Sequence, residues 1–164
     1  MKCISVYLKI ISIYICSIII VYAEERIPVD ITSDEMQWDD NKRIAYAIGN
    51  AAAIQGKRKM QADKLIVYLE KNNDTNEIIL IKAEGNVIFT NMDEIATGKL
   101  ATYDFIKNNI IIEDEVTLMK NDNLMKGELL EMNLNTGISQ ISSKNDSKKV
   151  KMRFLPKTNN EGIE

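Results

Sequence analysis

The amino-acid sequence predicts an all-β domain, built as a regular meander of short antiparallel strands. Three observations indicate this class: apolar and polar residues alternate at period two, β-branched residues are abundant, and one five-residue pattern recurs along the chain. With 45% hydrophobic and 27% charged residues among 164, the chain can form one domain with its own core. Histidine is absent, which excludes Ser-His-Asp hydrolases, Cys-His proteases and His-ligated metal sites.

The recurring pattern defines units of two strands each. Its copies are Ala47–Ala51, Ala83–Val87 and Ile112–Val116, spaced 36 and 29 residues apart, with Gly-Asn, Gly-Asn and Asp-Glu at their centres. In each unit a second signature begins 13 residues after the central Gly or Asp, so the register holds across both strands. These second signatures are Ala62–Leu65, Gly98–Ala101 and Gly127–Leu130.

Aligning the units shows which side chains share one face of the sheet, because side chains alternate between faces along a strand. One face is apolar at every aligned position, so we expect it to line the interior, either as a packed core or as an open apolar groove. Its members are Ala45, Ala47, Ala51, Ala53, Ile81, Ala83, Val87, Phe89, Ile110, Ile112, Val116 and Leu118 on the first strands, and Leu65, Val67, Leu69, Ala101, Tyr103, Phe105, Leu130, Met132 and Leu134 on the returning strands.

The N-terminal segment has the pattern of a secretory signal. Two lysines precede the apolar run Ile10–Val21, which is shorter than the ~20 residues of a membrane span, and Val21 and Ala23 suit a signal peptidase site. We therefore expect residues 1–23 to be removed on export, leaving Glu24 as the first residue. An uncleaved membrane anchor is the alternative.

Removal of this segment changes the chemistry that remains. Cys3 and Cys16 both lie in it, so the exported chain has no thiol and can form no disulfide, zinc ribbon or iron-sulfur cluster. The formal charge falls from −3 to −5, because two lysines and no acid are lost. Such an acidic chain is not expected to bind nucleic acid.

The remaining polar clusters favour neither catalysis nor metal binding. Asn72, Asp74 and Asn76 have the first spacings of a calcium loop, but the glycine and glutamate of positions six and twelve are missing. The basic run Gly56–Lys59 lacks the pattern of a phosphate loop and predicts either a solvated turn or a contact with an anionic head group. We expect no enzyme activity, metal or cofactor, since nothing fixes two carboxylates across a substrate. The acidic clusters are Asp34-Glu35, Asp39-Asp40, Asp93-Glu94 and Glu113-Asp114-Glu115.

An ordered set of motifs spans nearly the whole exported chain: Ile27–Asp34, Gly49-Asn50-Ala51, Gln55-Gly56, Gln61–Leu65, Ala101–Phe105, Met125–Glu128 and Val150–Pro156. The set resembles the periplasmic lipopolysaccharide-transport protein A, or OstA-like, family, whose G-N-V and N-A-D-K motifs match the second and fourth members. The chain departs from this family by placing alanine at several inward positions where larger apolar residues are common.

The resemblance implies an antiparallel β-jellyroll, V-shaped in section and open at both edges, over residues 24–156. From the sequence itself we expect residues 157–164 to form a flexible tail. The resemblance also implies a periplasmic bridge, without cofactor, that carries lipopolysaccharide from the inner to the outer membrane. On this basis we expect the acyl chains of lipid A to contact Val29, Ile31, Ala47, Ile81, Val87, Phe89, Tyr103, Phe105, Ile112, Val116, Leu118 and Met132.

The resemblance further implies assembly through the open edges, since an unpaired strand invites an added strand. The implied partners are further copies of the chain joined head to tail, an inner-membrane anchored protein of the same fold, and the N-terminal domain of the outer-membrane translocon. We expect the strand Ile27–Ser33, with Ile27, Val29 and Ile31, to receive the upstream partner. Lys151, Arg153 and Leu155 would be offered to the downstream partner.

Three alternatives stay open at this point: a membrane-anchored relative of the same transport system, a structural β-solenoid polymer without lipid cargo, and an enzyme acting on cell-wall glycans. Cleavage of residues 1–23 distinguishes the soluble bridge from the first alternative, the membrane-anchored relative. The intact mass of the protein recovered from the periplasm should correspond to a chain that begins at Glu24. A species that begins at Met1 would contradict this and indicate the anchored relative.

Overall fold

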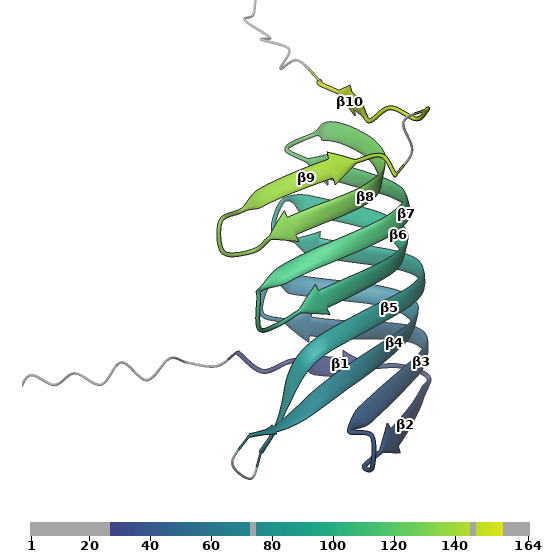
Figure 1. Cartoon of the computed structure of the whole chain (residues 1–164), viewed down its shortest axis with the longest axis vertical. Helices are drawn as coiled ribbons and strands as arrows, with labels where there is room; N and C mark the ends of the chain where they lie inside the picture. The colour runs from purple at the N-terminus through teal and green to yellow at the C-terminus, as the bar shows by residue number, and fades with distance from the viewer. Residues whose placement is uncertain (1–26, 73–74, 145–146, 156–164) are drawn as a thin grey trace, which may run out of the picture.

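The structure, a computed structural model, describes residues 27–72, 75–144 and 147–155. These residues form one 10-stranded antiparallel sheet, which confirms the predicted all-β class (Figure 1). The predicted signal peptide and C-terminal tail lie outside the described residues. The strands are β1 (Asp30–Thr32), β2 (Glu35–Asp39), β3 (Ile44–Gln55), β4 (Arg58–Asn72), β5 (Thr75–Asn91), β6 (Glu94–Asp104), β7 (Asn109–Lys120), β8 (Asn123–Asn133), β9 (Ile138–Ser142) and β10 (Lys151–Arg153).

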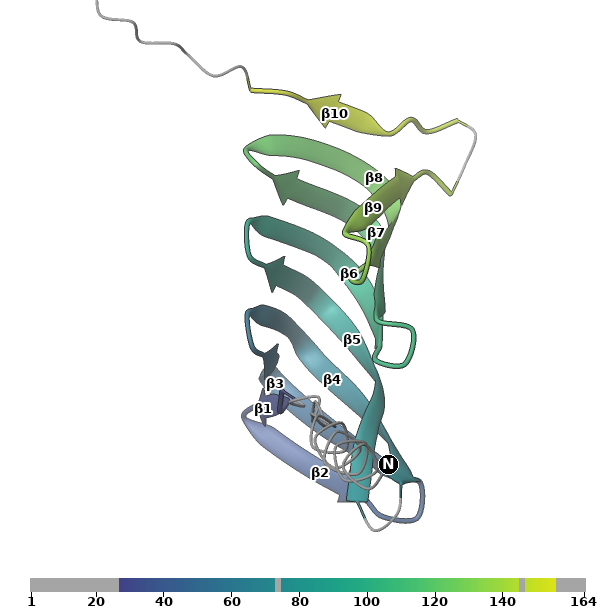
Figure 2. The ribbon, with the colours of Figure 1, turned by 90° about the vertical axis from the view of Figure 1, so that its left-hand side faces the viewer.

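At each end of the sheet, two short strands pair with the same long strand. Both β1 and β2 pair with β3, β1 along Ala52–Ile54 and β2 along Ile44–Ile48. Likewise β10 pairs with Leu124–Lys126 of β8, and β9 with Leu129–Asn133. Each long strand therefore has two halves. We call the two sets of halves the arms of the molecule: one arm ends in β1 and β10, and the other ends in β2 and β9. Figures 1 and 2 show β3 to β8 stacked between the two ends of the sheet.

The prediction of short strands is wrong for the middle of the sheet, where β3 to β8 are 11 to 17 residues long. Each of these strands continues through a bend instead of ending in a turn. At the bends of β3, β5 and β7 two consecutive residues have positive φ, and the pairing register skips them. These pairs are Gly49 and Asn50 (φ 77° and 45°), Gly85 and Asn86 (76° and 46°), and Asp114 and Glu115 (64° and 56°).

The first two bends are held by the same contact. The amide Nδ2 of Asn50 donates a hydrogen bond to Asp34 Oδ2 at 2.8 Å, and Asn86 Nδ2 donates to Asp63 Oδ2 at 2.9 Å. A Cβ atom added at Gly85 would lie 2.2 Å from Asp63 Oδ2. Glycine is thus required at position 85 for two reasons: its positive φ and the close approach of the Asp63 side chain.

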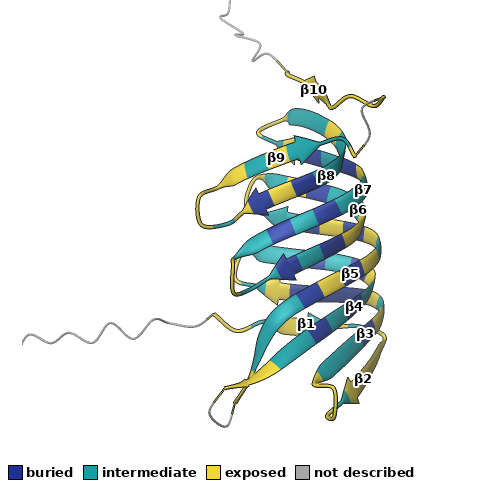
Figure 3. Ribbon diagram, in the orientation of Figure 1, coloured by how far each residue is buried: buried dark blue, intermediate teal, exposed yellow. Residues whose placement is uncertain are grey.

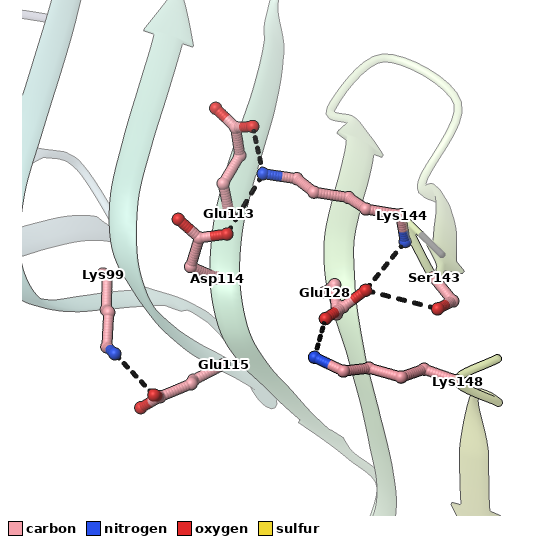
Figure 4. A network of polar contacts seen from close by, with 8 residues as sticks. All are labelled: Lys99, Glu113, Asp114, Glu115, Glu128, Ser143, Lys144 and Lys148. Carbon is pink, nitrogen blue, oxygen red and sulfur yellow. Dashed lines mark hydrogen bonds and ion pairs between the residues drawn. The ribbon is translucent and has the colours of Figure 1, made fainter. Parts of the chain in front are cut away.

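The third bend has no glycine and depends on lysines. Lys144 Nζ lies 2.9 Å from Glu113 Oε1 and 3.1 Å from Asp114 Oδ1, and Lys99 pairs with Glu115 (Figure 4). These cations offset the repulsion of three successive carboxylates, the last two of which belong to residues with positive φ.

The interior between the arms is packed with apolar side chains, and no polar or charged residue is buried in the described part of the chain. Figure 3 shows that the buried residues are spread over the stacked long strands. The predicted apolar face is this interior: its aligned positions are buried, or half-buried and packed against the core, as at Ala45, Leu69, Phe105 and Leu134. Together with the bends, this gives the jellyroll that the family resemblance implied. The buried core comprises Ala47, Ala51, Ala53, Met60, Ala62, Leu65, Val67, Ile81, Ala83, Val87, Phe89, Ala96, Ala101, Tyr103, Ile110, Ile112, Val116, Leu118, Leu130 and Met132.

The segment between β9 and β10 is tied to the sheet by Glu128. Its carboxylate pairs with Lys148 and accepts hydrogen bonds from the Lys144 backbone N–H at 3.0 Å and from Ser143 Oγ at 3.3 Å (Figure 4). The hydrogen bond from Lys148 is the main reason why the pKa of Glu128 lies below its ordinary value. The same contact raises the pKa of Lys148. These contacts orient the chain that leads to β10.

The bends should dominate stability, and Gly85→Ala tests this. Alanine at Gly85 requires a left-handed residue and also displaces Asp63 from Asn86, so we expect a loss of about 2 to 3 kcal/mol in the free energy of unfolding. Gly137→Ala is the matched control, because Gly137 has a similar φ of 70° but nothing within 4 Å of the added Cβ. It should cost only about 1 kcal/mol of strain. Urea denaturation measures both, and equal losses would contradict the role of the aspartate contact.

The docking of β10 should depend on pH through Glu128. Because the folded-state pKa of this carboxyl lies below its ordinary 4.5, its stabilisation is complete above pH 4.5 and is lost as pH falls through the lowered pKa. NMR should show the Lys151–Arg153 amide signals losing their strand shifts in this range. At neutral pH, Glu128→Gln should speed tryptic cleavage near β10, whereas Glu131→Gln, on the exposed face of β8, should not. Equal cleavage of the two variants would show that the contacts of Glu128 do not hold the segment before β10.

Candidate functional site

A groove of about 1080 Å³ lies at the mouth of the molecule, between the two arms and opposite the bends. Hairpin ends of both arms line it, including those of β4–β5, β6–β7 and β8–β9 at the left of Figure 1. Its apolar lining is Ile27, Pro28, Val29, Ile78, Met92, Phe105 and Ile106, and its polar lining includes Gln55, Lys57, Arg58, Asn76, Glu77, Asn91, Tyr103, Asn108 and Asn135. The groove can therefore hold an amphiphile, with an apolar part inside and a polar part at the rim.

Four side chains cross this mouth, and we refer to Gln55, Arg58, Tyr103 and Asn108 as the mouth bridge. Tyr103 Oη on β6 donates to Gln55 Oε1 at 3.1 Å and accepts from Arg58 Nη1 at 3.0 Å. Arg58 Nη1 also donates to Asn108 Oδ1 at 3.3 Å. Gln55 and Arg58 flank the β3–β4 turn in one arm, so the bridge links the two arms by hydrogen bonds alone.

The tyrosine at the centre of the bridge is a neutral phenol at physiological pH. Burial raises the pKa of Tyr103, and the nearby positive charge of Arg58 counteracts this only in part. A neutral hydroxyl both donates and accepts, as the two bonds require. The Tyr103 ring also stacks on Phe105, with ring centroids 4.0 Å apart, which forms an aromatic wall inside the mouth.

The residues expected to contact lipid fall into two groups. Val29, Tyr103 and Phe105 line the groove, and Ile31 is half-buried against the core beside them. The others are no more than 4% exposed and lie deeper between the arms: Ala47, Ile81, Val87, Phe89, Ile112, Val116, Leu118 and Met132. Of these, Ile81 and Phe89 border a small void of about 10 Å³ that adjoins the aromatic wall.

The polar rim is only partly anticipated by the sequence: the basic run Gly56–Lys59 predicts either a solvated turn or a head-group contact, and Gln55 is not among the expected site residues. Gln55 continues the inward row of Ala51 and Ala53, and Arg58 continues that of Ala62 and Met60. Extending the period-two pattern by one step toward the turn would have found both residues.

The expected partner edges lie at opposite ends of the sheet. Both strands are shorter than predicted: β1 begins at Asp30, after Ile27 and Val29, and β10 ends at Arg153, before Leu155. Ile27 and Leu155 are exposed, as is every residue of β10. Within the described chain, each of these strands has one pairing partner, so its other edge is unpaired.

The β2 end leaves part of the inner face uncovered. Met36 and Trp38 pair opposite Ala47 and Ala45 and so share the face of the core, yet they are 58% and 53% exposed. The indole N–H of Trp38 donates to Asp40. Large apolar side chains exposed at a sheet end are typical of a contact surface.

Neither a metal centre nor a membrane helix occurs in the described ranges. There, no three His, Cys, Asp or Glu side chains are grouped so as to hold a metal ion. The same residues include no helix long and apolar enough to cross a membrane.

Comparisons with known proteins agree with one another. Residues 30–138 match the family model described as LptA/(LptD N-terminal domain) LPS transport protein. The chain is 26% identical over 91 residues to the LPS-assembly protein LptD of Vibrio cholerae serotype O1. The match covers 56% of this chain but only 10% of that relative.

The fold resembles that of a solved structure, LptH, described as the LptA homologous periplasmic component of the lipopolysaccharide transport device from Pseudomonas aeruginosa. The TM-score is 0.70 at 17% identity, with 79% of this chain and 96% of that chain covered. At this identity the likeness is one of fold. Because the family model covers most of the chain, this protein belongs to the LptA/(LptD N-terminal domain) family of LPS transport proteins.

Proposed function

We propose that this protein is a periplasmic bridge component that carries lipopolysaccharide from the inner to the outer membrane, with the acyl chains of lipid A held between its two arms. The observation that carries the proposal is the continuous apolar inner face of β3 to β8, which reaches the groove at the mouth. Transport along such a face requires no chemical step, so the protein would act as a carrier and not as an enzyme.

Lipid entry would begin at the mouth. Val29, Tyr103 and Phe105 are among the apolar contacts that an acyl chain would meet in the groove. The deeper residues, such as Phe89 and Leu118, would become available as the arms separate. The acyl chain would then pack against the side chains of each arm in place of the side chains of the opposite arm. In the mouth bridge only a few hydrogen bonds oppose that separation, each with a net value of about 1 kcal/mol.

Assembly would follow the charge of the two ends. The β1–β2 end has an acidic excess, whereas the described residues of the β9–β10 end are basic. The first carries Asp30, Asp34, Glu35, Asp39 and Asp40 against Lys42 and Arg43, and the second carries Lys144, Lys148, Lys149, Lys151 and Arg153. Opposite charges favour head-to-tail contact over contact between like ends. The exposed Met36 and Trp38 would be covered by the core of the upstream unit.

The proposed partners are therefore those implied by the family: further copies of the chain, an inner-membrane anchored protein of the same fold, and the N-terminal domain of the outer-membrane translocon. In each case one open edge would be extended by a strand of the partner. The surrounding compartment would be the periplasm, after cleavage of residues 1–23.

A second candidate is a structural β-solenoid polymer without lipid cargo. The filled interior favours it, because the core residues of the described chain pack against one another. The two candidates differ in whether lipid ever reaches the inner face.

Photocrosslinking in cells separates them. A photoreactive residue in place of Val29 or Phe105, both at the groove, should form lipopolysaccharide adducts in the exported protein. The same probe at Lys82, on the exposed face of β5, is the control and should form none. A folded, exported protein that gives no adduct at either groove position but forms filaments would refute the carrier and support the polymer.

A further inference from the structure

The inward-facing rows of one arm end at the mouth in a ladder of polar side chains. Successive cross-strand pairs join Gln55 to Arg58, Arg58 to Asn91, Asn91 to Glu94, and Glu94 to Lys120. Each ladder residue lies two positions from a buried one in the same row: Ala53, Met60, Phe89, Ala96 and Leu118. The ladder therefore marks the boundary between the apolar interior and solvent.

The two cations of this ladder have different partners. Lys120 forms an ion pair with Glu94, whose side chain is only 14% exposed. Arg58 is half-buried and donates to two neutral oxygens, those of the Tyr103 hydroxyl and the Asn108 amide. In the described part of the chain, no carboxylate lies within ion-pair distance of Arg58.

The guanidinium of Arg58 has unused capacity. Both of its hydrogen bonds come from Nη1, and no bond within the described residues involves Nε or Nη2. A guanidinium presents five N–H donors in a planar fork that fits two oxygens of a phosphate, and such charge-assisted bonds are about twice as strong as neutral ones.

The charge around Arg58 also favours an anion. Lys57 lines the same groove beside it. Among the described residues that line the groove, Glu77 is the one acid, and its Oε2 accepts a hydrogen bond from Asn72. The other described lining residues are neutral, so the described part of the rim carries a net positive charge next to an apolar pocket.

We propose that Arg58 binds a phosphate monoester of an amphiphilic ligand whose apolar chains occupy the groove. The inference rests on the proposed function, in which the phosphorylated head of lipid A supplies this group. The phosphate replaces the Tyr103 hydroxyl and the Asn108 amide as acceptors of the Arg58 hydrogen bonds. Two of the three hydrogen bonds of the mouth bridge are thereby released, and the arms separate as the cargo enters.

The test compares two ligands and three proteins. Bis-phosphorylated lipid A and the same lipid after enzymatic removal of its phosphates are titrated, in one detergent, against the wild type, Arg58→Gln and Lys120→Gln. The wild type should bind the phosphorylated lipid about tenfold more tightly or better. Arg58→Gln should abolish this ratio, whereas Lys120→Gln, which removes the paired cation of the same rim, should retain it.

The outcomes separate this inference from the proposed function. If the wild type binds neither lipid, the carrier function itself fails. If it binds both lipids equally, or if Arg58→Gln retains the ratio, only the role of Arg58 fails. Inorganic phosphate in large excess should not displace the lipid, and displacement would instead indicate a site for free phosphate.

Circular dichroism shows whether Arg58→Gln folds. If it does not, the conservative variant Arg58→Lys tests the same contact. Arg58→Lys keeps the charge but loses the planar fork, so the preference for the phosphorylated lipid should fall several-fold without disappearing. An unchanged preference in Arg58→Lys would overturn the bidentate contact.

Discussion

The architecture depends on pairs of left-handed residues in the middle of long strands. An ordinary β-strand alternates its side chains along a straight course, and one sheet of such strands has a single apolar face with nothing to cover it. Two consecutive residues with positive φ, as at Gly85 and Asn86, turn the strand so that its second half packs over its first. The sheet thereby covers itself, and no helix or second sheet is needed for the described residues to form a core.

Period two and the repeat alignment predicted the inner face correctly, from Ala45 through Leu134, because a buried face leaves a regular apolar pattern in every unit. The same alignment identified the three bends as equivalent positions without indicating what they do. Gly-Asn within a strand pattern is typical of a turn as much as of a bulge, and Asp-Glu has no strong left-handed preference. The strand lengths were wrong for this reason.

The candidate site was predictable only in part. The resemblance together with the alternation pointed to Val29, Tyr103 and Phe105, which line the groove. Whether the interior is open or filled depends on the separation of the arms, which no local pattern encodes. For Arg58 the sequence left a solvated turn and a head-group contact open, and Gln55 was missed because residues beside a turn are expected to be solvated. The partners of both residues across the mouth were not predicted, because only the bend brings the opposite arm close enough to provide them.

The three bends are held by different contacts, and the two ends of the sheet therefore differ in how strongly added salt weakens them. The bends of β3 and β5 rely on glycine and on short hydrogen bonds from uncharged asparagine amides to aspartate, which added salt weakens little. The bend of β7 relies on exposed lysine–carboxylate pairs, whose attraction is screened over about 10 Å at 0.1 M ionic strength. Lys144 belongs to the segment that leads to β10, so screening loosens the last bend and the C-terminal edge together. The β1–β2 end of the sheet is thus the more salt-tolerant of the two.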